Sequence, residues 1–216
     1  MKYKHIIWDW NGTLLDDARL CVEILNSMLH SRKMKTTTLS EYQSEFDFPV
    51  FNYYLKLGFN FKQEDYDAVA REYIAAYNSQ YRKCLLRNGI LDFINLLKSG
   101  GISQSVLSAS QYSSLLNAIE SYELRHLFEN ICGLDDYYAH SKVDLGRKLL
   151  KNINACGNLR GEDVLLIGDT THDYEVAREL GADCLLLPAG HQSIERLTAT
   201  GAKICNNLKE AHKFII

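Results

Sequence analysis

Acidic and hydroxyl side chains follow three short apolar runs that lie far apart in this chain of 216 residues. Asp9 comes directly after HIIW, Ser108 after SVL, and Asp169 after LLIG. In parallel α/β sheets, ligands bind outside the carboxyl ends of the strands, so these side chains meet if the runs are neighbouring strands. Carboxylates gathered there repel one another unless they share a cation, and Mg²⁺ prefers hard oxygen ligands, including phosphate oxygens. The pattern therefore favours a site for Mg²⁺ and a phosphate group.

Two further residues extend this candidate site. Asp173 lies four residues after Asp169, and Lys142 stands just before a predicted helix in the segment AHSKVDLGRKLL. A hydroxyl, free backbone N–H groups and a lysine together form a cradle for phosphate oxygens. Taken separately, Asp169 and Asp173 are also explained as an N-cap and a first-turn acid of a helix. The agreement of all these residues on one chemistry favours the phosphate site.

The elements that must position these residues are visible as apolar runs of strand length. Each run is nearly continuous rather than alternating, which is typical of strands covered by helices on both faces. The runs are His5–Trp8, Ser105–Leu107, Val164–Ile167, Cys184–Leu187 and, more weakly, Ala202–Cys205. Helical spacing marks three segments between them: Gly89–Ser99, Val143–Asn154 and Asp173–Leu180. This alternation predicts an α/β fold with a mostly parallel sheet.

The stretch from about residue 17 to 87 has a different pattern. It shows helical spacing and no buried strand, so we expect an all-helical insertion after the first strand. The expected helices are Ala18–Leu29, Leu39–Glu45 and Glu64–Tyr81. Its aromatic segment Phe46–Tyr54 is interpreted as core of the insertion, since aromatic side chains are mostly buried, with a substrate-reading surface as the alternative. No Lys or Arg occurs in this segment before Lys56, so it gives no sign of a second anion pocket.

Composition limits the classes of protein. With 46% hydrophobic residues the chain can bury a core sized for one large domain, or for a core with a smaller insert. A formal net charge of −3 argues against a nucleic-acid partner, and no apolar stretch is long enough to span a membrane or to act as a signal peptide. The six cysteines are far apart and read as free thiols, so we expect a cytoplasmic protein. They are Cys21, Cys84, Cys132, Cys156, Cys184 and Cys205.

Four segments together resemble the motifs of the haloacid dehalogenase superfamily. DWNGTLLD, residues 9–16, resembles the first motif, and VLSAS with Ser108 is similar to the second. Lys142 matches the third motif, and GDTTHD, residues 168–173, resembles the fourth. The resemblance is to the phosphoglycolate phosphatase-like branch, which carries a C1-type helical cap. It implies a doubly wound, Rossmann-like core at residues 1–15 and 88–216, with the first strand central, and a helical cap domain at residues 16–87.

The resemblance also implies a covalent mechanism that depends on magnesium. Asp9 would attack phosphorus and form an aspartyl-phosphate. The metal would be held by the carboxylates of Asp9 and Asp169 and the backbone carbonyl of Asn11, with Asp173 close by. It would neutralise the approach of an anionic nucleophile to an anionic phosphate.

The same resemblance assigns the phosphate cradle. Ser108, Lys142 and the N–H of Ala109 would bind the phosphoryl oxygens and stabilise the charge of the transition state. Thr13 would support the geometry of the loop after the nucleophile. The substrate would be a small phosphorylated metabolite, and we expect the protein to act as a monomer or homodimer.

Asn11 departs from the pattern of the family's phosphatases, which carry an acid–base aspartate at this position. An amide donates a hydrogen bond but delivers no proton at neutral pH, and the loss of a general acid–base commonly costs about 10²–10⁴-fold in rate. Three interpretations stay open: slow hydrolysis or hydrolysis of esters with good leaving groups, a substitute acid–base, or a catalytically weak phosphate-binding or regulatory protein. The substitute would be His172, Asp16 or a group of the substrate. His191, in AGHQS, is interpreted as a loop residue.

Overall fold

The computed structural model describes residues 2–134, 142–155 and 159–216. A six-stranded sheet forms the centre of the molecule, and every pairing between its strands is parallel. From one edge to the other, its strands are β5 (Asn130–Leu134), β4 (Ser103–Gln111), β1 (His5–Trp8), β6 (Val164–Gly168), β7 (Asp183–Leu186) and β8 (Lys203–Ile204). The first strand is central, so the predicted α/β fold is confirmed.

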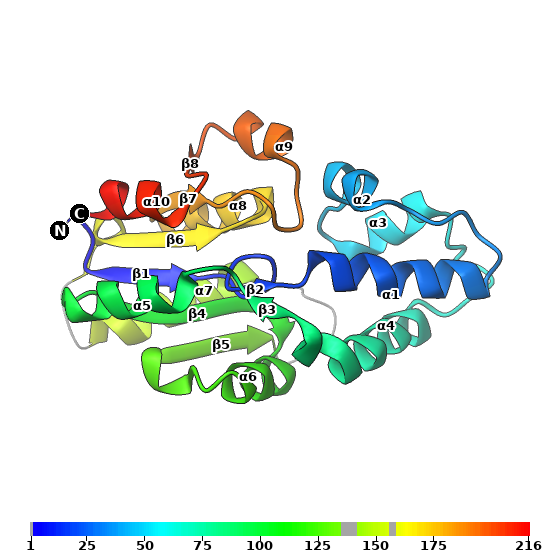
Figure 1. Cartoon of the computed structure of the whole chain (residues 1–216), viewed down its shortest axis with the longest axis horizontal. Helices are drawn as coiled ribbons and strands as arrows, with labels where there is room; N and C mark the ends of the chain where they lie inside the picture. The colour runs from blue at the N-terminus through cyan, green and yellow to red at the C-terminus, as the bar shows by residue number, and fades with distance from the viewer. Residues whose placement is uncertain (1, 135–141, 156–158) are drawn as a thin grey trace.

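Alternation along β1 explains why helices cover both faces of the sheet. Ile6 and Trp8 pack into one apolar cluster and Ile7 into another, and all three side chains are fully buried. The first face is covered by α5 (Ile90–Ser99) and α10 (Leu208–Ile215), and the second by α7 (Lys142–Ala155) and α8 (Thr171–Leu180) (Figure 1). A strand buried on both sides has no solvent-facing residue, which accounts for its continuous apolar sequence.

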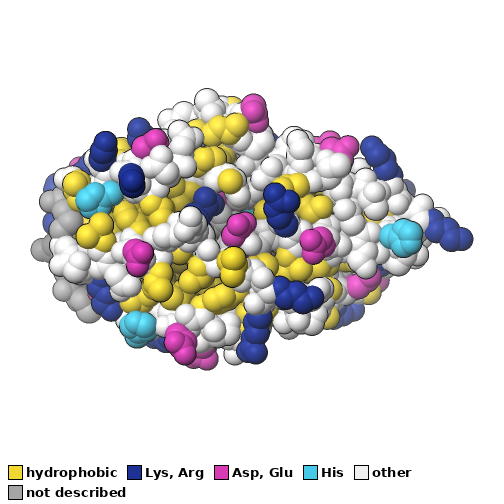
Figure 2. Space-filling view, in the orientation of Figure 1, with side chains coloured by type: hydrophobic (Ala, Val, Ile, Leu, Met, Phe, Trp, Pro, Cys, Tyr) yellow, Lys and Arg dark blue, Asp and Glu magenta, His cyan; other side chains and the backbone are white. Residues whose placement is uncertain are grey.

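The remaining core elements lie around this sandwich. Helix α6 (Tyr112–Ser121) packs beside β4 and β5, and α9 (Ile194–Ala199) lies between β7 and β8 in the chain. Short 3-10 turns occur at Tyr81–Lys83, Arg125–Leu127 and Gly161–Asp163. None of the described helices is long and apolar enough to cross a membrane. On the face shown in Figure 2, basic and acidic side chains are interspersed rather than separated by sign.

Four helices lie beyond the carboxyl ends of the strands, on the side of the molecule opposite the two termini (Figure 1). They are α1 (Ala18–Ser31), α2 (Leu39–Glu45), α3 (Val50–Leu57) and α4 (Tyr66–Gln80). Their apolar side chains belong to the same buried cluster as one face of the sheet. The separation of residues 16–87 as a cap domain stays a prediction.

The chain enters and leaves this helical part through one short antiparallel pair, β2 (Leu15–Asp16) and β3 (Leu85–Leu86). The expectation of an insertion without strands therefore misses β3, because two residues are too few to show a period. Arg87, just after β3, donates from its guanidinium to the carbonyl oxygens of Gly12, Thr13 and Pro188 at 2.5, 2.9 and 2.9 Å. This arginine fixes the exit of the helical part against the loop that follows β1.

Other differences from the expected elements have local causes. Strand β4 extends to Gln111 rather than ending at Leu107, because residues 108–111, three of which are polar, stay extended across a register shift against β5. Strand β5, with the sequence NICGL, lacks the continuous apolar run of β1 and β6. The expected elements also do not include helix α6, although it buries Leu115, Ala118 and Ile119 at helical spacing. Helix α3 is not among the expected helices, because most of its residues are interpreted only as part of the aromatic segment Phe46–Tyr54.

The core predicts a contrast between two adjacent leucines of α5. Leu97 is 2% exposed and Leu96 is 51% exposed. We expect Leu97→Ala to lower the free energy of unfolding by about 2–5 kcal/mol, because it leaves a cavity. Leu96→Ala is the matched control and should change it by less than about 0.5 kcal/mol. Urea unfolding followed by circular dichroism measures both, and equal losses would contradict the assigned faces of α5.

Candidate active site

The register of the sheet brings the ends of three strands together. Trp8, the last residue of β1, stands opposite Val106 of β4 and Ile167 of β6. The next residue, Asp9, donates from its backbone N–H to the carbonyl of Ile167 at 2.9 Å. Asp169 directly follows β6, and Ser108 lies within β4; each stands two residues beyond the partner of Trp8. The three polar positions expected at this edge therefore do lie side by side.

Three buried carboxylates gather at this edge. Asp9, Asp169 and Asp173 are at most 7% exposed, and one oxygen from each lies within 4.8 Å of the others. Burial raises the pKa of Asp9 to about 8, and it also raises the pKa of Asp169. Such crowding of oxygen ligands fits a hard divalent cation, whose charge would offset both burial and mutual repulsion.

Lys142 is the cation that the chain itself supplies. Its Nζ donates to Asp9 Oδ1 at 2.5 Å and to Asp173 Oδ1 at 2.6 Å, and the residue is only 3% exposed. Burial lowers the pKa of Lys142, but the two carboxylates outweigh this and hold it above its ordinary value. Burial likewise raises the pKa of Asp173, and Lys142 outweighs that effect and holds it below its ordinary value. One lysine thus links two of the three carboxylates.

Asp173 is also part of the start of helix α8. Its Oδ2 accepts from Thr170 Oγ1 at 2.6 Å and from the backbone N–H groups of Thr170 and Asp169 at 3.0 and 3.2 Å. Thr170 is the N-cap of α8, and the two residues form a capping box. The interpretation of Asp169 as the N-cap of this helix is therefore wrong, because the N-cap is the next residue. Asp173 is the expected first-turn acid, and it also lies among the carboxylates. Helix capping holds this carboxylate toward Lys142.

Asp169 is held from both sides. Thr13 Oγ1 donates to its Oδ1 at 2.7 Å, and the backbone N–H of His191 donates to its Oδ2 at 2.6 Å. Gly12 lies against the same carboxylate with φ of 72°, and a Cβ at Gly12 would collide with Asp169 and with the ring of His191. Only glycine fits this turn, since it has the required conformation and leaves room for the carboxylate.

The phosphate-binding candidates line one cavity with the nucleophile candidate. Its wall includes Asp9, Ser108, Ala109, Lys142 and Asp173, and its volume is about 230 Å³. Ser108 Oγ accepts from the backbone N–H of Ser110 at 3.1 Å. Thr13 is fully buried behind this wall, where it contacts Asp169. The structure thus brings the sequence-predicted residues together.

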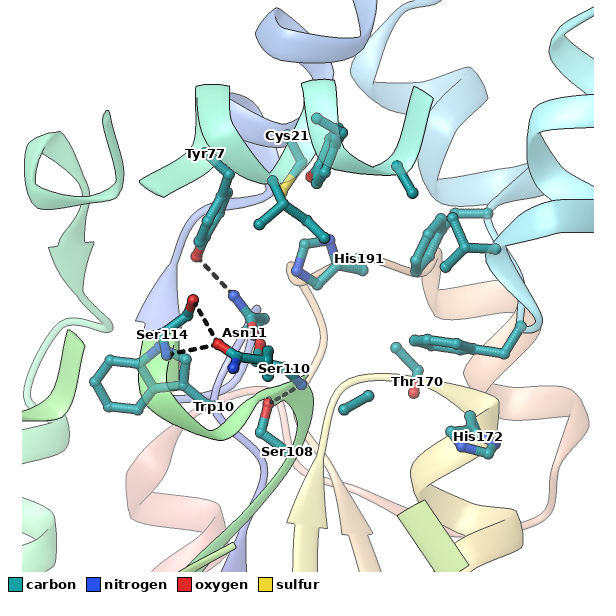
Figure 3. Close-up of a pocket in the computed structure, with 18 of the residues that line it drawn as sticks. Trp10, Asn11, Cys21, Tyr77, Ser108, Ser110, Ser114, Thr170, His172 and His191 are labelled. Carbon is teal, nitrogen blue, oxygen red and sulfur yellow. Dashed lines mark hydrogen bonds between the residues drawn. The ribbon is translucent and has the colours of Figure 1, made fainter. Parts of the chain in front are cut away.

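Asn11 is fixed through all of its amide atoms. Its Nδ2 donates to Asp17 Oδ2 at 2.6 Å and to the hydroxyl of Tyr77 at 2.7 Å, and its Oδ1 accepts from Ser110 Oγ at 2.7 Å. Tyr77 in turn donates to Asp17 Oδ2 at 2.6 Å. In Figure 3, Tyr77 reaches down from α4 toward Asn11, and Ser110 lies below. Contacts from the helical part and from β4 therefore orient the loop after Asp9.

Asp17 and His191 are a buried pair that the sequence did not reveal. His191 Nε2 lies 3.2 Å from Asp17 Oδ1, the hydroxyl of Tyr42 lies 2.8 Å from His191 Nδ1, and Gly12 N–H donates to Asp17 Oδ1 at 2.8 Å. Burial lowers the pKa of His191, but Asp17 outweighs it and raises this pKa to about 9. Burial raises the pKa of Asp17, but the charge of His191 outweighs it and holds this pKa below its usual range. His191 does lie in a loop, yet its ring joins that loop to α1 and α2.

The two side chains considered as substitute acid–bases differ in position. Asp16 is exposed in β2 and is not part of the cavity wall. His172 lines the cavity, and its ring lies 4.8 Å from that of Phe48, centroid to centroid. In Figure 3, His172 stands on the side of the cavity opposite Trp10 and Tyr77. Of these two residues, only His172 is therefore positioned to act as a substitute acid–base.

The aromatic segment Phe46–Tyr54 contributes both to the core and to the cavity. Tyr53 and Tyr54 are at most 3% exposed and belong to the main apolar cluster. Phe46 and Phe48 are half-buried, and both line the cavity. Phe46 stacks on Tyr42, with ring centroids 4.9 Å apart, and Phe48 meets Phe46 edge to face at 5.3 Å. The segment thus supplies one wall above the carboxylates.

Comparison with known proteins places this geometry among hydrolases. A family model described as haloacid dehalogenase-like hydrolase matches residues 6–187. The chain is 22% identical over 205 residues to "Probable phosphatase IndB" of Dickeya dadantii (strain 3937), covering 92% of this chain and 87% of that protein. Its fold is similar to the crystal structure of a predicted phosphatase from Clostridium acetobutylicum, with a TM-score of 0.82, 21% identity, and 100% and 99% of the two chains covered. It is also similar to that of a predicted phosphoglycolate phosphatase from Haemophilus somnus 129pt, with a TM-score of 0.77, 16% identity and the same coverage.

The pair of Asp17 and His191 predicts a dependence of stability on pH. Because His191 has a folded pKa of about 9 and an unfolded pKa near 6.5, the folded state holds this proton more tightly. The stability that it contributes is complete below about pH 6.5 and is lost as the pH rises through 9. We expect His191→Gln to lower the free energy of unfolding by about 3 kcal/mol at pH 6, and by less at pH 9.5.

Urea unfolding in EDTA at the two pH values measures this difference. His30→Gln is the control, because His30 is exposed near the end of α1. A loss for His191→Gln that is the same at both pH values would contradict the ion pair.

Proposed function

Because this chain belongs to the haloacid dehalogenase-like hydrolase family, we propose that it is a phosphatase that uses Mg²⁺ to hydrolyse a small phosphomonoester through Asp9. The observation that carries the proposal is Lys142 Nζ, which lies 2.5 Å from Asp9 and 2.6 Å from Asp173 at the carboxyl edge of a parallel sheet. A lysine that joins a nucleophile candidate to a metal-ligand candidate suits the transfer of an anionic group.

In this proposal Asp9 attacks phosphorus and carries the phosphoryl group as an aspartyl-phosphate until water removes it. Mg²⁺, held by Asp9, Asp169 and the carbonyl of Asn11, with Asp173 nearby, would neutralise charge on the nucleophile and the phosphate. Thr13 and the backbone N–H of His191 keep Asp169 oriented through hydrogen bonds of 2.7 and 2.6 Å. A ligand fixed before the metal binds loses little freedom on binding, which favours occupancy.

The phosphoryl oxygens are bound by the cradle on the other side of Asp9. Ser108 and Ala109 reach the cavity at the bend where β4 shifts its register, and Lys142 reaches it from the first turn of α7. Donors fixed in a buried site stabilise transition-state charge more than donors in water do. Lys142 therefore has two roles: it balances Asp9 and Asp173 at rest, and it binds phosphoryl oxygen during the reaction.

The proposal also covers the cap domain, the cellular location and the partners of the enzyme. Helices α1–α4 over the site suit residues 16–87 as a cap of the phosphoglycolate phosphatase-like branch, which would open to admit substrate and close to exclude water. We expect a cytoplasmic monomer or homodimer that acts on a phosphorylated metabolite and binds neither nucleic acid nor membrane.

A catalytically weak phosphate-binding or regulatory protein is the second candidate, and Asn11 is the observation that favours it. Its amide contacts Asp17 and Tyr77 and has no proton to transfer to a leaving group. The carboxylates and Lys142 favour the enzyme, because a protein that only binds phosphate does not need three buried acids beside it.

Phosphate release separates the two candidates. We expect the wild type to release phosphate from at least one phosphomonoester in a panel, to require Mg²⁺ and to stop in EDTA. Asp9→Asn keeps the shape of the side chain but removes the nucleophile, and should lower the rate at least about 10³-fold. Equal rates for wild type and Asp9→Asn on every ester would rule out the enzyme.

Restoring a carboxyl group at position 11 tests whether the missing acid limits turnover. The new carboxyl of Asn11→Asp would stand beside Asp17, which is 2.6 Å from the present amide, and the like charge would raise its pKa and keep it protonated. We expect kcat on an alkyl phosphate to rise about 10–10²-fold, since general acids contribute about 10²–10⁴-fold.

Asn11→Ala is the matched control for this experiment, because it removes the amide without adding an acid. It should show no increase. No increase with Asn11→Asp either would mean that another group already supplies the proton.

A further inference from the structure

Nine of the 29 described residues that wall the cavity above Asp9 are Trp, Tyr or Phe. They come from the loop after β1, from α2, from the segment between α2 and α3, from α3 itself and from α4, and they include Trp10, Phe46, Phe48, Tyr53, Tyr73 and Tyr77. Several are already packed on one another, as in the stack of Tyr73 and Tyr77 with centroids 6.3 Å apart. Rings held by neighbouring rings form a rigid apolar box, which favours a flat apolar ligand.

Among the described residues, the cavity wall offers no free Lys or Arg for a second anionic group. Lys142 is the single Lys or Arg among the described residues of its wall, and it is engaged with Asp9 and Asp173. The ring of His191 also lines the cavity, and its Nε2 lies 3.2 Å from Asp17 Oδ1. A carboxylate or a second phosphate on the leaving group would therefore be buried without a partner, which is strongly unfavourable.

The volume of the cavity is about 230 Å³. It lies below the roughly 300–1,000 Å³ of pockets that take drug-sized molecules. One phosphate group and one ring system fit in this space.

The fixed amide of Asn11 limits the chemistry of the leaving group. Both of its polar atoms are engaged, with Asp17, Tyr77 and Ser110, so this position supplies no proton to the departing oxygen. An alkyl oxide leaves poorly without a proton, whereas a phenol ionises near pH 10 and leaves as a relatively stable anion. The aromatic rings of the wall and the lack of an acid at position 11 thus point to the same kind of ester.

We propose that the substrate is the phosphate monoester of a phenol, in which the ester oxygen is attached directly to the aromatic ring, and that it carries no second anionic group. This inference rests on the proposed function. The Asp9 carboxylate forms a bond to phosphorus as the bond from phosphorus to the aryl oxygen breaks, and the aryl oxide leaves with that electron pair and takes a proton from water. Water then breaks the aspartyl-phosphate, which yields inorganic phosphate and restores Asp9.

Four esters separate the elements of this proposal when kcat/KM is measured with saturating Mg²⁺. Phenyl phosphate has an aromatic ring and a good leaving group, and benzyl phosphate has the aromatic ring only. Cyclohexyl phosphate has a saturated ring and a poor leaving group, and 4-carboxyphenyl phosphate adds an anion to the aryl ester. We expect phenyl phosphate to exceed benzyl phosphate by about 10²–10⁴-fold, the range that a general acid spans. Benzyl should exceed cyclohexyl phosphate, and the carboxylate should lower kcat/KM at least tenfold.

Two variants connect these preferences to the residues. In Asn11→Asp the ratio of phenyl to benzyl phosphate should shrink at least tenfold, because an acid at position 11 helps only the poor leaving group. Phe48→Leu should lower kcat/KM for phenyl phosphate about 3- to 10-fold, as expected for one lost ring contact. The matched control is Phe51→Leu, since Phe51 is 37% exposed and packs on Phe61 and Tyr66 instead of lining the cavity.

The outcomes distinguish this inference from the function on which it rests. Phosphate release that is fastest from cyclohexyl phosphate, or from the doubly anionic 2-phosphoglycolate, would overturn the aromatic substrate and leave the phosphatase intact. A ratio of phenyl to benzyl phosphate that is the same in Asn11→Asp would also overturn it. No difference between wild type and Asp9→Asn on any of these esters would overturn both proposals.

Discussion

Charge balance among buried carboxylates is the constraint on which this site depends. Asp9, Asp169 and Asp173 are buried within 4.8 Å of one another, and Lys142 supplies one positive charge for them. Because an unpaired buried charge is very unfavourable, the surrounding elements must hold the lysine between the acids and leave room for a further cation. The capping box of α8, the start of α7 and the glycine turn at Gly12 all serve this arrangement.

A second buried pair connects the sheet to the helices above it. His191, in the loop after β7, meets Asp17 at the start of α1 and Tyr42 in α2, while its backbone N–H holds Asp169. The loop that orients a proposed metal ligand is thus fixed by side chains of the helical part. Asn11 shares Asp17 with this pair. The residue stands where the family's phosphatases carry an acid, and both of its polar side-chain atoms have hydrogen-bond partners.

Most of the fold could be predicted because its signals are local. The strands β1 and β6 are continuous apolar runs, since a strand covered on both faces needs nothing else, and α1, α2 and α5 show a clear helical period. The strands that the sequence does not predict lack such a pattern. Strands β2 and β3 have only two residues each. The apolar residues of β5, with the sequence NICGL, are interrupted by polar and small ones.

The sequence by itself determined which residues gather at the carboxyl edge, because parallel pairing brings Asp9, Ser108 and Asp169 together whatever the loops do. It also determined the absence of an acid at Asn11. Only the tertiary structure decided the partners of these residues: that Lys142 contacts both Asp9 and Asp173, that Asp17 meets His191, and that the aromatic residues form a cavity wall over the site. The physical reason is that strand register follows from local hydrogen bonding, whereas contacts between side chains of distant loops and helices depend on how whole elements pack.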